Sequence, residues 1–184
     1  MNGLIVYKGK YGATQQYAEW AGEDLGLDVY TTDSLYSARL EQADFVVIAS
    51  AVYMGKMLVR DWFRKHEAVL RNKKLFLLVV CATPASEGQK RGEFVNASVP
   101  VPLLDRMDIF FVPGRLTIGR LSWRDRLILR MGRMMEKDPA KKKAMGQDLD
   151  AVKRERLAEL VKAVGKYTPS AVAHAQPEQA VRIY

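Results

Sequence analysis

The chain has 184 residues, of which 48% are hydrophobic and 27% charged, which fits one globular domain and excludes a disordered composition. A single cysteine excludes an intrachain disulfide, no apolar run reaches the ~20 residues that span a bilayer, and no signal-peptide pattern opens the chain, so we expect a cytoplasmic protein. The net charge of +8 is concentrated in residues 113–143, which hold ten Lys or Arg against three acids.

Five apolar runs bounded by turn residues are the expected strands: residues 3–7, 27–31, 45–49, 75–80 and 109–112. Helix-period segments predict helices over residues 13–25, closed by Gly26, over about 58–70 and over about 149–167. A short helical turn after residue 33 or 34 and a short helix near residue 93 are also expected. This alternation predicts an α/β fold, an open doubly wound sheet of five parallel strands in the order 2-1-3-4-5 with helices on both faces.

The loop after the first strand has the features of a phosphate site, because two glycines allow a tight turn and a helix N-terminus follows. It lacks the Gly-Lys-Ser/Thr of a Walker A loop and the glycine spacing of a dinucleotide site. A plain glycine-containing turn stays an alternative. The candidate residues are Lys8, Gly9, Lys10, Tyr11, Gly12, Ala13 and Thr14.

Two further loops lie at the same end of the predicted sheet. Tyr53 could lie flat against a planar ring, although packing within its own loop is the alternative. Cys81 fits a small buried apolar residue better than a reactive thiol. The candidate residues in these loops are Ser50, Ala51, Val52, Tyr53, Met54, Gly55 and Lys56, followed by Ala82, Thr83 and Pro84.

The basic segment after the fifth strand predicts an amphipathic helix that Ser122 and Asp125 cap. Its apolar arc is flanked by cations, which suits a membrane interface or an apolar substrate channel; a helix packed on the domain with a solvated basic side is the alternative. Arg124 falls inside the arc and Leu129 outside it. The arc is Trp123, Leu127, Ile128, Met131, Met134 and Met135, and the flanking cations are Arg126, Arg130, Arg133 and Lys137.

The motifs Tyr7-x-x-x-x-Gly12-x-Thr14, with Ala18 after it, and Ser50-Ala-Val-Tyr53-x-Gly55 resemble the flavodoxin family over about residues 4–167. Gly114-x-Leu116 and the run from Arg120 through Trp123 to Arg126 resemble the insertion of one branch, the menaquinone-dependent protoporphyrinogen IX dehydrogenases. The chain departs from the family at Gly9 and Tyr11, where flavodoxins usually have hydroxyl residues. Backbone amides and Lys8 or Lys10 would then bind more of the phosphate.

This resemblance implies one flavodoxin-like domain over residues 1–167, with a basic helical insertion at about 113–143 and a tail at 168–184. It implies bound flavin mononucleotide (FMN) as the catalyst, with no catalytic side chain and no metal. The implied reaction is protoporphyrinogen IX dehydrogenation in haem biosynthesis, with a quinone as acceptor, at the inner face of the cell membrane. The residues for substrate or membrane would be Trp123, Arg126, Leu127, Arg130, Met131, Arg133 and Met134.

Two other functions stay open. A flavodoxin-type electron carrier would dock an acidic protein partner through the basic segment. A module of the same fold without FMN would bind lipid or nucleic acid. The main expectation is that the protein does not bind nucleic acid. A homo-oligomer is also left open.

Overall fold

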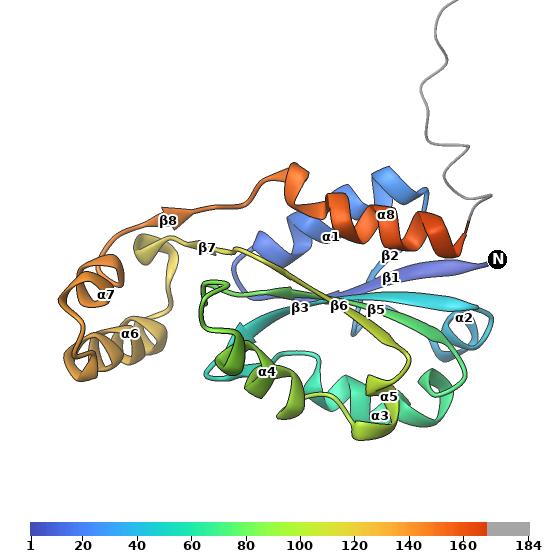
Figure 1. The fold of residues 1–184 in the computed structure, drawn as a ribbon, viewed down its shortest axis with the longest axis horizontal. Helices are drawn as coiled ribbons and strands as arrows, with labels where there is room; N and C mark the ends of the chain where they lie inside the picture. Colours follow the sequence, from blue (N-terminus) through green and yellow to red (C-terminus); the bar gives the residue numbers. More distant parts are fainter. Residues whose placement is uncertain (169–184) are drawn as a thin grey trace, which may run out of the picture.

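The computed structural model describes residues 1–168, which form a parallel sheet with helices on both faces (Figure 1). Its strand order is β2-β1-β3-β5-β6, which confirms the predicted order, because β4 is only a two-residue strand paired antiparallel with the end of β3. The strands are β1 (Gly3–Lys8), β2 (Val29–Thr31), β3 (Phe45–Tyr53), β4 (Lys56–Met57), β5 (Lys74–Val80) and β6 (Met107–Val112).

The central strands are buried on both faces. Residues of β1 alternate between two cores: Leu4 and Val6 face one, and Ile5 faces the other. In Figure 1, α1 (Ala13–Leu25) and α8 (Ala158–Tyr167) cover one face. The other face packs against α3 (Arg60–Leu70), α4 (Gly88–Asn96) and α5 (Val101–Leu104), while α2 (Ser37–Glu41) lies near the opposite end of the sheet from the insertion.

Several boundaries differ from the sequence expectation. The third strand continues to Tyr53 instead of ending at residue 49, because a two-residue turn at Met54 and Gly55 folds it back onto β4. Both turn residues have positive φ, 49° and 76°, as the right-handed twist of a tight hairpin requires. The second strand begins at Val29, and α5 was not expected.

The last helix was expected from residue 149, and this start is wrong. Residues 149–150 form β8 (Leu149–Asp150), which pairs antiparallel with β7 (Arg115–Leu116). A short 3-10 turn, η2 (Arg154–Leu157), then leads into α8. The predicted first helix is confirmed, with α1 ending before Gly26.

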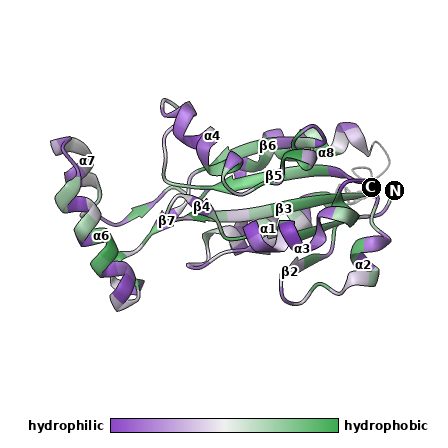
Figure 2. Cartoon of the chain, turned by 90° about the horizontal axis from the view of Figure 1, so that it is seen from below, coloured by the Kyte–Doolittle hydropathy of each residue, from purple (hydrophilic) through white to green (hydrophobic). Residues whose placement is uncertain are grey.

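The insertion leaves the domain along β7 and returns along β8, and it projects beyond the end of the sheet (Figures 1 and 2). Between these strands lie η1 (Ile118–Arg120), α6 (Trp123–Met135) and α7 (Pro139–Ala144). Arg115 Nε lies 2.8 Å from Asp150 Oδ2, and the Ile118 amide donates to Asp148 Oδ1 at 2.8 Å. The base of the insertion is therefore closed by both backbone pairing and charged side chains.

None of the helices within residues 1–168 has both the length and the apolar character needed to cross a membrane. Of the tail expected at 168–184, residues 169–184 lie outside the described residues, whereas Thr168 is buried and caps α8 by donating to the Val164 carbonyl.

Candidate functional site

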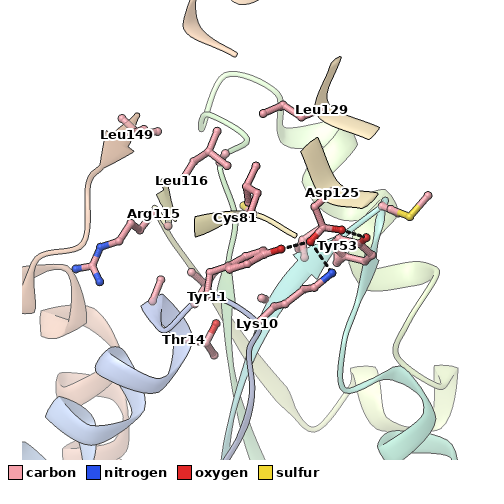
Figure 3. A pocket seen from close by; sticks show the side chains of 18 of the residues that line it. Lys10, Tyr11, Thr14, Tyr53, Cys81, Arg115, Leu116, Asp125, Leu129 and Leu149 are labelled. Atoms are coloured by element: carbon pink, nitrogen blue, oxygen red, sulfur yellow. Dashed lines mark hydrogen bonds and ion pairs between the residues drawn. The ribbon is translucent and has the colours of Figure 1, made fainter. Parts of the chain in front are cut away.

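A cavity of about 430 Å³ opens at the carboxyl ends of β1, β3, β5 and β6, which is where doubly wound sheets bind ligands (Figure 3). Three loops of the domain and the inner side of the insertion enclose it. The lining residues from the domain are Lys10, Tyr11, Ala13, Thr14, Ala51, Val52, Tyr53, Met54, Leu58, Val80, Cys81 and Ala82; those from the insertion and its base are Gly114, Arg115, Leu116, Leu121, Asp125, Ile128, Leu129, Met145 and Leu149.

The first loop carries free backbone donors beside this cavity, and Ala13 and Thr14 form part of its lining. Within the part of the chain that the structure describes, the amides of residues 12–15 donate no hydrogen bond, and they stand at the positive end of the α1 dipole. Gly12 has a φ of 85°, and a Cβ added there would meet no atom within 4 Å. The surface in front of these amides is therefore open to an anion.

Gly9 and Thr14 explain why the loop is so compact. A Cβ on Gly9 would lie 2.8 Å from the Cβ of Thr14, so only glycine allows this side chain to fold over the loop. Thr14 is buried and lines the cavity. These features fit a phosphate group bound by amides and one hydroxyl, whereas Lys8, Gly9 and Gly12 do not themselves line the cavity.

The second loop places Ala51, Val52, Tyr53 and Met54 on the cavity wall, and it leaves Gly55 and Lys56 outside. Ser50 is fully buried away from the cavity: its hydroxyl accepts from the Val59 amide at 3.3 Å and donates to the Ala51 carbonyl at 3.0 Å. Ser50 therefore holds the loop in place and does not face a ligand.

The third loop contributes Cys81 and Ala82, and Thr83 and Pro84 lie outside the lining. Arg91 of α4 fixes this loop from behind, because its Nε and Nη2 donate to the Thr83 carbonyl at 3.0 and 2.8 Å. Burial raises the pKa of the Cys81 thiol, which agrees with the expected small buried residue.

A cluster of polar side chains joins the first two loops to the insertion (Figure 3). Asp125, which is 6% exposed, accepts hydrogen bonds from the hydroxyls of Tyr11 and Tyr53 and pairs with Lys10. The Lys10 Nζ atom lies 2.6 Å from Asp125 Oδ2 and 4.1 Å from the centre of the Tyr53 ring. Hydrogen bonds from Lys10, Tyr11 and Tyr53 hold the pKa of Asp125 well below its usual range, and Asp125 in turn raises the pKa of Lys10.

Sequence reasoning missed Asp125 as a site residue, because it treated this residue only as part of a helix cap. The cap itself is present: the Ser122 hydroxyl accepts from the Asp125 amide at 3.2 Å. The backbone of Asp125 makes this bond, so its carboxylate is free to point toward the domain. A lone acid at the start of a strongly basic helix was the available signal.

The insertion also gives the cavity an apolar wall, formed by Leu116, Leu121, Ile128, Leu129, Met145 and Leu149. Leu129, which did not fit the predicted apolar arc, is half-buried on this wall one turn after Asp125. The inner face of α6 thus combines Ile128, which belongs to the predicted arc, with Asp125 and Leu129, which the arc excluded.

The residues predicted for substrate or membrane lie on the other side of α6. They do not line the cavity, and their side chains are exposed, with Trp123 at 71% and Met134 at 75%. Arg126 is bonded within the insertion, to the carbonyls of Ile118 and Gly119. The exposed set is Trp123, Arg126, Leu127, Arg130, Met131, Arg133 and Met134.

Among residues 1–168, no group of three or more His, Cys, Asp or Glu side chains comes together in a way that could hold a metal ion. The arrangement instead combines an anion site, an aromatic side chain and an apolar wall around one cavity. This combination suits a large planar ligand that carries a phosphate.

Solved structures of several redox proteins share a distant likeness with the chain. A flavodoxin, WrbA-like protein from Agrobacterium tumefaciens is 19% identical, with 60% of this chain and 82% of that chain covered and a TM-score of 0.44. An azoreductase from Bacillus anthracis is 11% identical, with 90% and 100% covered and a TM-score of 0.45. At these values the likeness adds no argument about function.

The sequence comparisons are more decisive about the family. No curated protein matches the chain at a significant level. The family described as flavodoxin domain matches residues 4–143, which is most of the chain and includes all three cavity loops and α6. This match, which agrees with the observed strand order, shows that the chain belongs to the flavodoxin family.

Proposed function

We propose that this flavodoxin-domain protein binds FMN in the 430 Å³ cavity and acts as an FMN-dependent oxidoreductase. The observation that carries the proposal is the row of unpartnered amides at residues 12–15, in the described chain, beside a cavity bordered by Tyr53. The amides and the Thr14 hydroxyl would bind the phosphate, and Tyr53 and Ala82 would border the ring. Bound FMN would supply the capacity to accept and release electrons.

The test is the flavin content and the ligand preference of the purified protein. The holoprotein should be yellow, and mass spectrometry of the released ligand should identify FMN. The apoprotein should bind FMN much more tightly than riboflavin, since riboflavin lacks the phosphate. A colourless protein that binds neither ligand would favour a module of this fold without a flavin.

We further propose that the substrate is protoporphyrinogen IX, whose six-electron oxidation to protoporphyrin IX would pass two electrons and two protons to each of three quinone molecules. The support is the apolar wall that the insertion adds to the cavity, which suits a large apolar ring. Anaerobic mixing with the porphyrinogen and a water-soluble quinone should give porphyrin fluorescence. An electron carrier would instead exchange electrons with an acidic protein and leave the porphyrinogen unchanged.

The exposed side of α6 supports the proposal that this enzyme works at an anionic membrane surface. Trp123, Leu127, Met131 and Met134 are exposed there, and Arg130 of the same helix and Lys137, two residues after its end, are exposed cations. A second copy of the chain would carry the same positive charge, so an anionic lipid surface is the better complement to this face.

A further inference from the structure

Few polar contacts link α6 to the domain. In the described part of the chain, the hydrogen bonds and ion pairs that join α6 and its cap to the first two cavity loops all involve Asp125 or Ser122. Ser122 contributes only a 3.4 Å contact from its amide to the Tyr11 hydroxyl. The polar part of this contact therefore depends mainly on the Asp125 carboxylate.

This carboxylate uses its two oxygens for two different loops. Oδ1 accepts from the Tyr53 hydroxyl at 2.6 Å, and Oδ2 accepts from Tyr11 and pairs with Lys10. Tyr11 and Lys10 belong to the loop that precedes α1, whereas Tyr53 belongs to the end of β3. One buried group thus fixes the phosphate side and the ring side of the cavity relative to each other.

We propose that Asp125 is a positioning residue through which the insertion sets the geometry of the flavin site. This inference rests on the proposed FMN binding and adds a link from α6 to the two flavin loops. The link works in both directions, because any ligand that orders the loops also stabilises the docked position of α6. A surface that binds the exposed side of α6 would change the flavin affinity if it bound the docked and undocked positions of α6 with different affinities.

The test variant should remove the charge of Asp125 and retain the size of its side chain and the helix cap made by Ser122. Asp125→Asn keeps the backbone amide that Ser122 caps, but it removes the anion that Lys10 and both tyrosines contact. Hydrogen–deuterium exchange without flavin should then show faster exchange in residues 115–135 and in residues 51–56. Asp105→Asn is the matched control, because Asp105 is exposed, does not line the cavity and lies just before β6, at the end of that strand away from the cavity.

The flavin titration provides the second measurement. Asp125→Asn should weaken FMN binding about tenfold or more, as expected when hydrogen bonds to a charged group are lost. The Tyr11→Phe and Tyr53→Phe double variant removes the two phenol donors and should reproduce the exchange pattern, which provides a test if Asp125→Asn does not fold. Adding Asp125→Asn to Tyr53→Phe should cost less than the two separate losses combined, since both break the same contact.

Unchanged exchange in both variants would overturn the inference even if the wild-type protein binds FMN tightly. Faster exchange in a protein that binds no flavin would support the link between α6 and the loops, and it would reject only the proposed cofactor. Weaker FMN binding with unchanged exchange would also overturn the inference, because Asp125 would then act on the ligand and not on the loops.

Discussion

The phenol hydroxyl of Tyr53 donates to Asp125 Oδ1 at 2.6 Å, across 72 residues of sequence. The ring of Tyr53 therefore borders the cavity while its hydroxyl is tied to the insertion. Tyr53→Ala should raise the fluorescence of bound flavin and weaken binding by roughly 1 kcal/mol or more through the lost aromatic contact. Tyr53→Phe should retain the quenching but restore only part of the affinity. Equal fluorescence in wild type and Tyr53→Ala would remove Tyr53 from the flavin site.

Gly12 is expected to be essential for binding the phosphate. Gly12→Val places a branched side chain at a φ of 85°, which costs roughly 1–2 kcal/mol in backbone energy and favours a different conformation of the loop that carries the free amides. FMN affinity should fall at least about tenfold. Gly26→Val is the matched control: its φ of 64° imposes a similar strain at the other end of α1, so stability should fall while FMN affinity is retained.

Met54 is the only non-glycine residue with positive φ in the described chain, and it stands at the exposed tip of the β3–β4 turn on the cavity wall. Met54→Asn should raise the free energy of unfolding by roughly 0.5–1 kcal/mol, because asparagine tolerates this conformation better. If the methionine side chain contributes to the cavity, flavin or substrate binding should weaken at the same time. Thermal unfolding and flavin titration of one variant separate the two effects.

Binding to anionic vesicles should depend on Arg130 of α6 and on Lys137, two residues after its end. Arg130→Glu with Lys137→Glu should abolish binding that the wild type shows at low salt, because each cation contributes about 1 kcal/mol near such a surface. Arg64→Glu with Lys65→Glu makes the same charge change on α3 and should leave vesicle binding intact. Arg126 is a poor choice for this test, since it bonds to the carbonyls of Ile118 and Gly119. Wild-type protein that ignores anionic vesicles would leave the basic side as a solvated face.

The Asp125 contact should be insensitive to pH over the neutral range. A carboxyl whose pKa is lower in the folded protein adds stability above its unfolded value of about 3.9 and loses it as the pH falls toward the folded value. The pKa of Lys10 is raised, so the stability that its pairing with Asp125 contributes is lost only when the pH rises above about 10.4. The stability difference between wild type and Asp125→Asn should thus be constant from about pH 5 to 9 and shrink below about pH 4. A difference that changes between pH 6 and 8 would contradict the assignment.

The sheet could be predicted from the sequence because the patterns that mark its strands and helix ends are local. Buried strands such as residues 45–49 and 75–80 are continuous apolar runs, and glycines mark both ends of α1. The extension of β3 to Tyr53 could not be predicted, because a methionine occupies a turn position that usually holds glycine or asparagine. The amino acids at positions 149–150 are compatible with a helix, and only their pairing with residues 115–116 makes them a strand.

The cavity was predicted only on the side that the domain loops form. Lys10, Tyr11, Thr14, Tyr53 and Ala82 were found from strand ends, since every parallel strand ends at the same edge. The opposite wall depends on how the insertion folds back, and periodicity cannot supply that. The helical pattern placed α6 correctly but assigned function to its exposed side, whereas Asp125 and Leu129 face the cavity.

Because β7 pairs with β8, the insertion leaves the domain and returns to it at the same place. Both of its ends are held next to each other by this ladder, so the connection from β6 to α8 does not depend on how many residues lie between residues 117 and 148. Lengthening such a loop costs little chain entropy, about 0.6 kcal/mol for each doubling. This segment can therefore be exchanged, enlarged or shortened while the parallel sheet and the three cavity loops stay the same.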